Sequence, residues 1–577
     1  MTLLSKWGKN IDFINPLPEY PRMQMQRDSF YNLNGIWEYQ IVREDAMPDP
    51  DEWKKIVVPF ALGSELSGAP EILKPKQALW YRRQFAYKPS VLETWLNFEA
   101  VDTMCIVYLN GVQVGSHEGG YTPFSLNVSS QIKYQNALMV CCKDASNYGK
   151  YAYGKQKIEH GGMWYKPTAG IWGTVWLENT SAHAVQDLKI TPDYDGHSVH
   201  VDLAGDFDQA LITVSVKGHV IHSGVTNNKH YDAPIENMHA WSPDDPFLYD
   251  LYVQTEDDVV RSYFGMRKFR AGRDARGIMR FELNDRPLFL SGLLDQGYSV
   301  DGSYTYPDDE AIVYELTKIK EMGFNCLRKH AKIEGRRWYY RCDQLGILVM
   351  QDMPSGGMSS YDFMTTAFLP NIGFRHMKDT KSNRFTRPYA ARKYYYDELE
   401  EMLSELYNCT CIFAWVPFNE GWGQFDSEKV TEEIRGYDQT RLVDSASGWH
   451  DQGCGDFDSY HSYFMPFHAH KDKKNRIIIL SECGGYSYVE NGHSEPHKEY
   501  GYKKFKSKLD YNEAFFDLYE KQILPEIRNG LAGCIYTQVS DVEDECNGIF
   551  TADREVIKID ERRMRRINER CMRRLLK

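Results

Sequence analysis

The chain has 577 residues, with 68 lysines and arginines against 81 aspartates and glutamates, so its formal net charge is −13 with histidine neutral. This negative balance disfavours nucleic acid as the main partner, because phosphate binding needs a basic field or a large basic face. Hydrophobic residues make up 42%, charged residues 26% and aromatic residues 14% of the chain, which excludes disorder, collagen and coiled coil and fits several globular domains.

The N-terminus and the cysteines indicate the cellular compartment. Residues 1–10 lack the apolar core of a signal peptide, and no stretch approaches the ~20 apolar residues that span a bilayer. The twelve cysteines are dispersed without the spacing of a zinc knuckle or a redox motif, so we expect reduced thiols. We therefore predict a soluble, cytoplasmic protein with no membrane partner and no cofactor, and leave a homo-oligomer as an open alternative.

Short β-strands separated by turns are predicted over residues 30–180, in a domain that spans residues 1–180. Gly35–Tyr39, Trp95–Phe98 and Met104–Leu109 are strand-like runs, and Asn110-Gly111 is a hairpin signal. These runs predict a β-sandwich.

Residues 181–272 repeat the strand pattern with fewer aromatic residues. The alternating runs Val199–Leu203 and Leu211–Val216 place every second side chain on one face. A segment of this length with such runs is typical of one immunoglobulin-like sandwich.

Strands alternate with helical stretches from residue 273 to 577. The apolar spacing of residues 310–322 predicts a helix. Eight strands are predicted at Leu288–Gly292, Cys326–Arg328, Leu348–Gln351, Cys411–Phe418, Arg441–Asp444, Asp458–His461, Ile477–Ser481 and Gly533–Thr537. This alternation predicts a (β/α)₈ TIM barrel.

The C-terminal segment 561–577 is strongly basic and could be read as a nucleic-acid or membrane contact. However, Met564, Ile567, Cys571 and Leu575 fall at helical spacing. A final barrel helix with a solvated arginine face is the favoured interpretation.

Polar side chains follow nearly every predicted barrel strand, and the carboxyl ends of barrel strands meet around one pocket. They are Asp295, Arg328, His330, Asp352, Asn419, Glu420, Asp444, His461, Tyr463, Glu482 and Gln538. Glu420 and Glu482 stand out because each ends a strongly apolar run, where a carboxylate needs a partner. Two such carboxylates can act as acid and nucleophile in the cleavage of a glycosidic bond.

Several segments resemble those of glycoside hydrolase family 2, the family of β-galactosidases, β-glucuronidases and β-mannosidases. Trp415–Gln424 and Ile479–Gly485 resemble its acid/base and nucleophile segments, and Phe264–Arg267, Gly323–His330 and Cys342–Pro354 resemble other family segments in the same order. The resemblance covers nearly the whole chain. It implies a sugar-binding-like jelly roll over 1–180, an immunoglobulin-like sandwich over 181–272 and a catalytic barrel over 273–577.

The resemblance also implies roles for individual residues. Glu420 would be the general acid/base and Glu482 the nucleophile of a retaining double displacement, and Asn419 would bind the sugar 2-hydroxyl. Tyr463 matches a tyrosine that contacts the nucleophile. The other pocket residues expected to bind substrate are Asp295, Arg328, His330, Asp352, Trp422, Trp449, His461 and Gln538.

For some of these residues a structural role is an alternative. Arg328 and His330 could only brace the carboxylates through ion pairs, and Trp422 and Trp449 could pack in the core instead of stacking on a sugar. The long segment 355–388, which begins near Gly356-Gly357 and Ser359-Ser360, is expected to cover the site and shape leaving-group specificity.

The type of terminal sugar is predicted from one difference between this sequence and the motifs of the family. In the β-glucuronidases an Asn-x-Lys motif binds the sugar carboxylate, but the comparable stretch Asp544–Arg554 contains no lysine and is acidic. We therefore expect a neutral terminal sugar, with β-galactoside first. β-Glucoside and α-L-arabinofuranoside are alternatives, and β-glucuronide is disfavoured.

Two alternative functions from other classes remain. The chain could be a non-catalytic glycan-binding protein that holds glycan through Trp164 or Trp172 of the jelly roll. Metal-assisted hydrolysis is a second rival, but the sequence has no His-Glu-x-x-His motif, so we expect no metal.

Overall fold

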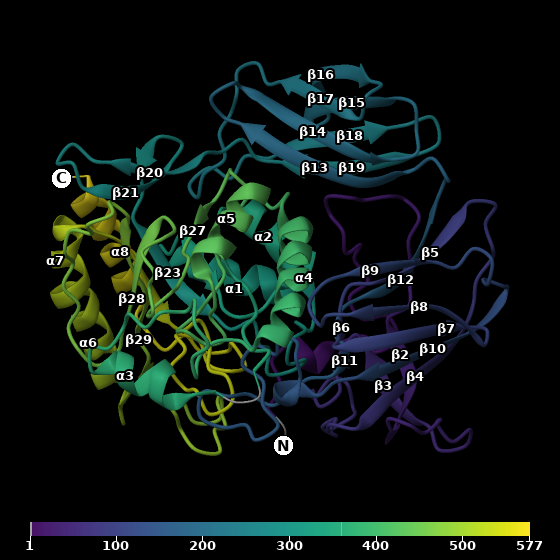
Figure 1. Cartoon of the computed structure of the whole chain (residues 1–577), viewed down its shortest axis with the longest axis horizontal. Coiled ribbons are helices and arrows are strands. Elements are labelled where there is room, and N and C mark those ends of the chain that lie inside the picture. The colour runs from purple at the N-terminus through teal and green to yellow at the C-terminus, as the bar shows by residue number, and fades with distance from the viewer. Residues whose placement is uncertain (1–2, 359–360, 577) are drawn as a thin grey trace.

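The computed structural model describes residues 3–358 and 361–576. Figure 1 shows two β-sheet regions and a barrel, with the immunoglobulin-like strands lying across the top of the view and the N-terminal strands beside the barrel. The predicted fold class is confirmed: two antiparallel β-sandwiches precede an eight-stranded parallel barrel. The exact division of the chain at residues 180 and 272 stays a prediction.

The N-terminal region is an antiparallel sandwich. Its larger sheet contains, in spatial order, β3 (Lys54–Val58), β2 (Gly35–Arg43), β4 (Gln77–Ala86), β10 (Gln135–Lys143), β7 (Met104–Leu109) and β8 (Val112–Glu118). The smaller sheet contains β1 (Tyr31–Asn32), β12 (Val175–Thr180), β5 (Glu93–Phe98) and β9 (Phe124–Asn127). Asn110 and Gly111 join β7 to β8 with φ angles of 53° and 82°, so the predicted hairpin turn is confirmed.

The second region is a smaller antiparallel sandwich. One sheet contains β13 (Val185–Asp193), β14 (Ser198–Gly205) and β17 (His230–Pro234), and the other contains β16 (His219–Thr226), β15 (Ala210–Val216), β18 (Tyr249–Gln254) and β19 (Val259–Phe264). Along β14, Val199, Val201 and Leu203 are buried while the residues between them face outward. This alternation is expected for a sheet that has one buried face and one solvent-exposed face.

A short sheet leads into the barrel. It contains β20 (Phe269–Arg273), β21 (Met279–Leu283) and β22 (Arg286–Pro287). The buried Arg280 donates to the backbone oxygens of Leu531 at 2.9 Å and Ile527 at 2.8 Å. This sheet therefore covers the end of the barrel from which the strands start.

The barrel strands are parallel. Their spatial order is β27 (Leu442–Val443), β26 (Ile412–Val416), β25 (Leu348–Asp352), β24 (Cys326–Lys329), β23 (Leu290–Asp295), β32 (Leu531–Thr537), β29 (Ile477–Gly484) and β28 (Phe457–Ser462). The backbone N–H of Asp456, just before β28, donates to Val443 O at 2.8 Å, which brings the last two edges together. All eight predicted strands are present with shifted ends. The largest shortening is at β26, which keeps five of the eight predicted residues, and β27 keeps two of four.

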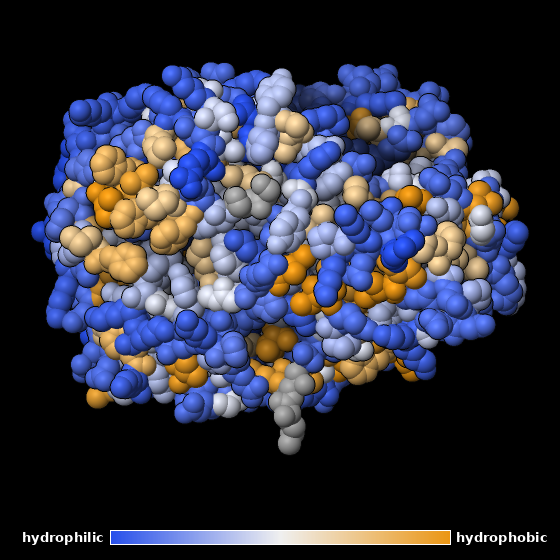
Figure 2. All heavy atoms as spheres, turned by 60° about the horizontal axis from the view of Figure 1, so that its bottom comes forward, coloured by the Kyte–Doolittle hydropathy of each residue, from blue (hydrophilic) through white to orange (hydrophobic). Residues whose placement is uncertain are grey.

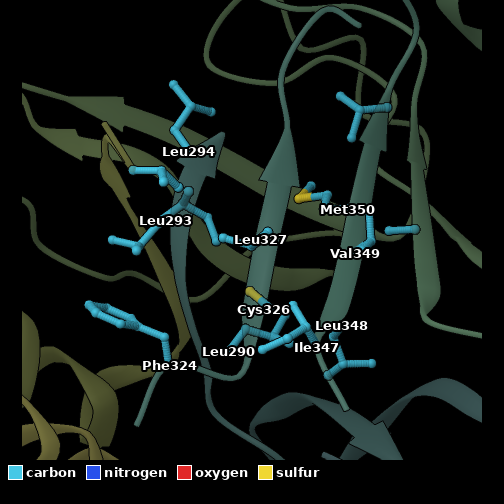
Figure 3. Packing of buried hydrophobic residues seen from close by; sticks show 14 of the residues in the cluster. Leu290, Leu293, Leu294, Phe324, Cys326, Leu327, Ile347, Leu348, Val349 and Met350 are labelled. Carbon is cyan, nitrogen blue, oxygen red and sulfur yellow. The ribbon is translucent and has the colours of Figure 1, made fainter. Parts of the chain in front are cut away.

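Burial of the strand side chains explains the apolar strand sequences. Leu293 of β23 pairs in register with Leu327 of β24, which pairs with Val349 of β25, and Figure 3 shows these side chains packed beside one another. All three are fully buried. Each such side chain contributes about 1.5–3 kcal/mol to folding by its removal from water.

Helices cover the barrel. They are α1 (Asp309–Glu321), α2 (Arg336–Leu345), α3 (Leu369–Asn371), α4 (Tyr389–Leu406), α5 (Ser427–Tyr437), α6 (Lys508–Asp517), α7 (Leu524–Glu526) and α8 (Glu561–Leu575). The helix predicted over 310–322 is α1, which begins with Asp308 as its cap, accepting from Ala311 N. In α8, Met564, Ile567 and Cys571 are buried, so the basic C-terminal segment is a docked barrel helix.

The face of the molecule in Figure 2 is mostly hydrophilic. Figure 2 shows one face on which apolar residues gather in separate patches. Large apolar side chains that remain exposed include Phe363, Phe368 and Phe374 in the long segment after β25. Within the described ranges, every helix is too short or too polar to cross a lipid bilayer.

Candidate functional site

Two glutamates meet at the carboxyl ends of the barrel strands. Glu420 lies in the loop after β26, and Glu482 lies near the end of β29. The Nδ1 atom of His461, from β28, is 2.7 Å from Oε1 of Glu420 and 3.5 Å from Oε2 of Glu482. One oxygen of each carboxylate lies within 4.8 Å of the other, so the two acids lie side by side.

Local backbone geometry aims Glu420 into this space. Its φ angle is 52°, an uncommon value for a residue with a side chain, and its N–H donates to Ser447 O at 2.9 Å. Gly421 follows with a φ of 70°, and a Cβ atom there would lie 2.4 Å from Cδ2 of His450. The sharp turn therefore depends on glycine at position 421.

Arg328 of β24 joins the polar groups of the site. Its guanidinium is fully buried and donates through Nε and Nη2 to both carboxylate oxygens of Asp352, at 2.9 and 3.0 Å. It also donates through Nη1 to Oε1 of Glu482 at 3.0 Å and through Nη2 to Oδ1 of Asn419 at 2.8 Å. One rigid cation thus fixes the positions of three side chains from three strands.

Asp352 is held in its ionised form. Burial alone would raise its pKa, but the charge of Arg328 and the hydrogen bond from His330 outweigh burial and lower the pKa of this carboxyl. His330 reaches it with Nδ1 at 2.8 Å. Arg328 thus contacts one of the two glutamates, as the bracing alternative expects, whereas His330 contacts Asp352; a role of either residue in substrate binding stays a prediction.

His461 is neutral in this environment. Burial lowers its pKa to about 3, although the charge of Glu482 opposes that shift. Its Nε2 lies 3.3 Å from Nη1 of Arg328, and an arginine can only donate. The imidazole proton therefore resides on Nδ1, which donates to Glu420.

Tyr463 contacts the second glutamate. Its hydroxyl donates to Oε2 of Glu482 and lies 3.0 Å from Oγ1 of Thr537. Its ring stacks on Tyr502 with centroids 3.7 Å apart and an interplanar angle of 8°. Glu482 thus receives one hydrogen bond on each oxygen, from Arg328 and from Tyr463.

Glu420 differs from Glu482 in its surroundings. Burial raises the pKa of Glu420, while the positive charges of Lys155, His330 and Arg328 oppose this shift. A raised pKa keeps a carboxyl group protonated at higher pH than usual, as a proton donor requires. Lys155 comes from the N-terminal region, so that region influences the barrel site.

Two predicted site residues use their polar groups elsewhere. Asp295 accepts from Lys329 Nζ at 2.6 Å and from Gly297 N at 2.8 Å. Gln538 accepts through Oε1 from Gln296 Nε2 at 2.7 Å. Neither residue contacts Glu420 or Glu482 through any hydrogen bond of the described residues.

The tryptophans lie beside the site in packed positions. Trp422 is buried against Tyr153 and Trp164 of the N-terminal region, with ring centroids 5.5 and 4.9 Å apart, and against Tyr361 at 6.0 Å. Trp449 is buried, and its ring centroid is 5.3 Å from that of His461. Trp422 therefore packs against the N-terminal region, and its stacking on a sugar stays a prediction.

The segment 355–388 and the N-terminal region meet beside this aromatic cluster. Tyr153 N and Gly154 N both donate to Ser355 O at 3.0 Å. Further along, Thr366 O accepts from Trp449 Nε1 at 2.8 Å. The expected covering segment thus borders the site, although Ser359-Ser360 at its start lie outside the described residues.

Five residues near the site had no signal that singled them out in the sequence: Lys155, Tyr361, Ser447, Ser481 and Tyr502. Ser447 Oγ lies 3.0 Å from His461 Nε2, and Ser481 O accepts from Arg328 at 3.2 Å. The serines follow or end predicted strands, which is the only pattern that could have marked them. Lys155 comes from another sheet region, and no local pattern predicts its approach.

Glu420, His461 and Glu482 could also be tested as metal ligands, since their ligand atoms cluster within 4.8 Å. The Arg328 cation lies 3.0 Å from Glu482. It already neutralises the carboxylate charge that would otherwise attract a metal ion. Acid–base chemistry fits this donor set better than metal binding.

Comparison with known protein families gives three matches along the chain. The model for the glycosyl hydrolase 2 galactose-binding domain-like family matches residues 72–187, that for glycosyl hydrolases family 2 matches 174–267, and that for the family 2 TIM barrel domain matches 279–558. The three matches follow one another in the order of the three structural regions.

The related proteins include both β-galactosidases and β-glucuronidases. A β-galactosidase of Thermoanaerobacter pseudethanolicus is 26% identical over 388 residues, covering 62% of this chain and 46% of that protein. A β-glucuronidase of Streptococcus agalactiae is 22% identical over 430 residues, covering 70% and 68%. The chain thus spans about half the length of the first of these curated relatives.

Solved structures show the same fold. A β-glucuronidase from an uncultured Clostridium species superposes with a TM-score of 0.76 at 18% identity, covering 95% of this chain and 99% of that one. The β-D-glucuronidase of Dictyoglomus thermophilum gives 0.75 at 16% identity, covering 96% and 98%. At these identities the likeness concerns the fold alone.

Proposed function

Because the chain belongs to glycoside hydrolase family 2, we propose that it is a retaining, exo-acting glycosidase that works by double displacement. One observation carries the proposal: Glu420 and Glu482 bring carboxylate oxygens within 4.8 Å of each other beside His461. Retaining glycosidases hold their two carboxyl groups about 5–5.5 Å apart, whereas inverting enzymes need about 6.5–9.5 Å to admit a water.

Glu420 is the proposed general acid/base. Burial raises its pKa, which favours the protonated form that the role needs, and this proton is donated to the glycosidic oxygen as the bond breaks. The neutral His461 donates from Nδ1 to one oxygen of Glu420 at 2.7 Å. This contact leaves the other oxygen to carry the proton toward the leaving group.

Glu482 is the proposed nucleophile. Hydrogen bonds from Arg328 and Tyr463 hold its two oxygens and orient it toward the anomeric carbon. Attack forms a covalent glycosyl ester, and the aglycone departs with the proton from Glu420. Glu420 then takes a proton from water, whose oxygen attacks the same carbon, and the sugar leaves with its original anomeric configuration.

Asn419 is proposed to bind the sugar 2-hydroxyl. Its Oδ1 accepts from Arg328 at 2.8 Å, so the amide turns its donor side away from that cation. Donation from this amide to the 2-hydroxyl strengthens as the oxocarbenium-like transition state develops.

A neutral terminal sugar, with β-galactoside first, is supported by the loops around the site. Glu545 contacts Tyr165, and Asp544 accepts from Gly162 N at 3.1 Å. The negative charge of Glu545 acts on Glu420 and raises its pKa, so an anionic sugar beside Glu420 would also be repelled. The aromatic cluster of Trp164, Tyr361 and Trp422 closes one side of the site, which favours a chain-end sugar.

A β-glucuronide is the second candidate, and one observation favours it. Lys155 brings a positive charge close enough to Glu420 to lower its pKa, and a nearby lysine could pair with a sugar carboxylate. The names of several relatives point the same way. β-Glucosides and α-L-arabinofuranosides remain further outcomes of the same test, and a glycan-binding protein without turnover remains the alternative from another class.

The test is a panel of nitrophenyl glycosides, measured with the native chain, Glu482→Ala and Glu513→Ala. Glu513 is an exposed glutamate on α6, so its variant is the control for loss of a carboxylate. We expect turnover of the β-galactoside by the native chain and the control, and none by Glu482→Ala. Turnover of the glucuronide alone would show that the substrate is a β-glucuronide and not a β-galactoside. Absence of turnover of every glycoside, with glycan binding retained, would overturn the proposal that the protein is an enzyme.

A further inference from the structure

Histidines and aspartates face each other on the outer surface of the immunoglobulin-like sandwich. On the antiparallel strands β14 and β17, at the top of Figure 1, His200 pairs in register with Asp232 and Asp202 pairs with His230. All four side chains alternate with buried or half-buried residues and therefore point to the solvent-exposed face of the sheet. The sequence pattern His-x-Asp occurs on both strands.

The side chains converge on one point. Nδ1 of His200 contacts Oδ1 of Asp232, and Nε2 of His230 lies 3.1 Å from the same oxygen. These three ligand atoms lie within 4.8 Å of one another. Nδ1 of His230 is 2.6 Å from Oδ1 of Asp202, and Nε2 of His200 is 3.9 Å from Asp193.

The two contacts of His230 restrict the protonation state of its imidazole ring. Both ring nitrogens face carboxylates, but a neutral imidazole carries only one N–H. If that proton is on Nδ1 and donates to Asp202, the lone pair of Nε2 faces Asp232. A cation between Nε2 and Asp232 satisfies both groups, whereas without one His230 must be an imidazolium.

We propose that this cluster is a binding site for a divalent first-row transition metal of the Zn²⁺ and Cu²⁺ class. The ligands are Nδ1 of His200, Nε2 of His230 and Oδ1 of Asp232, with water completing the shell. Zn²⁺ takes imidazole nitrogen and carboxylate oxygen at about 2.0–2.2 Å, so neighbouring tetrahedral ligands are about 3.3 Å apart. The 3.1 Å between His230 and Asp232 is close to that spacing.

The surrounding groups have the arrangement that supports metal ligands. Asp202 accepts from the non-ligating nitrogen of His230, which fixes the ring orientation and raises the basicity of the ligand nitrogen. Asp193 lies on the corresponding side of His200. Because the ligands come from two strands, a bound ion would link β14 to β17 at the outer edge of the sandwich.

The other clusters of such residues fit a metal less well. His493, Asp553 and Glu555 also place ligand atoms within 4.8 Å, but they include a single histidine, and Glu555 is paired with Lys9 at 3.2 Å. Copper and zinc favour imidazole, so two histidines distinguish the β14–β17 site.

Titration of the metal-free full chain with ZnCl₂ in a calorimeter tests the proposal. The double variant His200→Ala/His230→Ala should lose one Zn²⁺ per chain, or bind it at least tenfold more weakly. His239→Ala is the matched control, because His239 contacts Asp245 at 2.6 Å and is 47% exposed, against 46% for His230. The control should bind Zn²⁺ as the native chain does.

A second readout identifies the ligands. The Cu²⁺-loaded native chain should give an electron paramagnetic resonance spectrum with coupling to two imidazole nitrogens, and the double variant should not. Circular dichroism checks that each variant is folded. Equal Zn²⁺ stoichiometry and affinity in the native chain and the folded double variant, or a native Cu²⁺ spectrum unchanged by the substitutions, would overturn the proposal.

Discussion

His461 donates its only imidazole proton to Glu420, at 2.7 Å from Nδ1 to Oε1. The direction follows from Arg328, which approaches the other ring nitrogen and cannot accept. His461 therefore orients the proposed acid without titrating in the neutral range, because burial lowers its pKa to about 3. The proton that reaches the substrate comes from Glu420 itself.

Replacement of Glu420 by glutamine tests this assignment. The rate of glycosyl transfer should fall about 10²–10⁴-fold for leaving groups that need protonation, and much less for a dinitrophenyl leaving group. The basic limb of the kcat/KM profile, set by loss of the Glu420 proton, should disappear with the activated substrate. Equal losses for both leaving groups, measured by steady-state kinetics, would contradict the role.

Lys155 should influence the pH profile from the N-terminal region. Its positive charge lowers the pKa of Glu420, against the larger raising effect of burial. Lys155→Met should therefore raise that pKa and move the basic limb of kcat/KM to higher pH, because Glu420 stays protonated longer. Lys150→Met, an exposed lysine of the same segment, is the control. A limb that does not move would contradict the account, and loss of glucuronide turnover alone would identify Lys155 as a carboxylate ligand.

Arg328 should matter for both folding and rate. Arg328→Met leaves Asp352 and Glu482 without their buried cation, and breaking a buried pair in this way costs about 3–5 kcal/mol. Arg328→Lys keeps the charge but not the fork of donors, so we expect a folded protein with kcat/KM lowered about 100-fold. Chemical denaturation and kinetics measure the two effects. Native kinetics in the lysine variant would show that the fork is dispensable.

Part of this arrangement was predictable from the sequence. The rule that barrel strands end at one pocket brought Glu420 and Glu482 together, and apolar runs before each marked them. This rule could not distinguish Asp295 from the two glutamates, because Asp295 also lies at the end of a strand. Its register partner across the sheet is Lys329, and this neighbour neutralises it away from the two glutamates.

Contacts between regions were beyond local patterns. Trp422 follows the acid/base segment, so stacking on a sugar and packing were equally compatible with its position. Its neighbours Tyr153 and Trp164 come from a loop more than 250 residues earlier in the chain. Only the docking of the N-terminal region on the barrel determines which surface the indole meets.

Asp444 should limit stability at neutral and basic pH. It is buried at the end of β27, and among the described residues neither carboxylate oxygen has a hydrogen-bond partner. Burial raises its pKa to about 7, although the charge of Arg328 opposes this. The folded state thus binds the proton more tightly than the unfolded state, so ionisation destabilises the fold increasingly from about pH 4 to pH 7.

Asp444→Asn should therefore raise the unfolding temperature more at pH 8 than at pH 5. The gain in free energy of unfolding is at most about 4 kcal/mol above pH 7, for a pKa raised from 3.8 to about 7, and it vanishes below pH 4. Calorimetry at several pH values measures it, with the exposed Asp257→Asn as control. A gain independent of pH would contradict the argument.

The most direct test of the account is to trap the covalent intermediate. A 2-deoxy-2-fluoro glycoside of the sugar selected by the panel, with a good leaving group, should inactivate the native chain because the fluorine slows hydrolysis of the ester. Mass spectrometry of the peptides should locate one sugar on Glu482, and proton NMR of the normal reaction should show a first product of retained configuration. A label on another residue, or an inverted first product, would contradict the double displacement by Glu420 and Glu482.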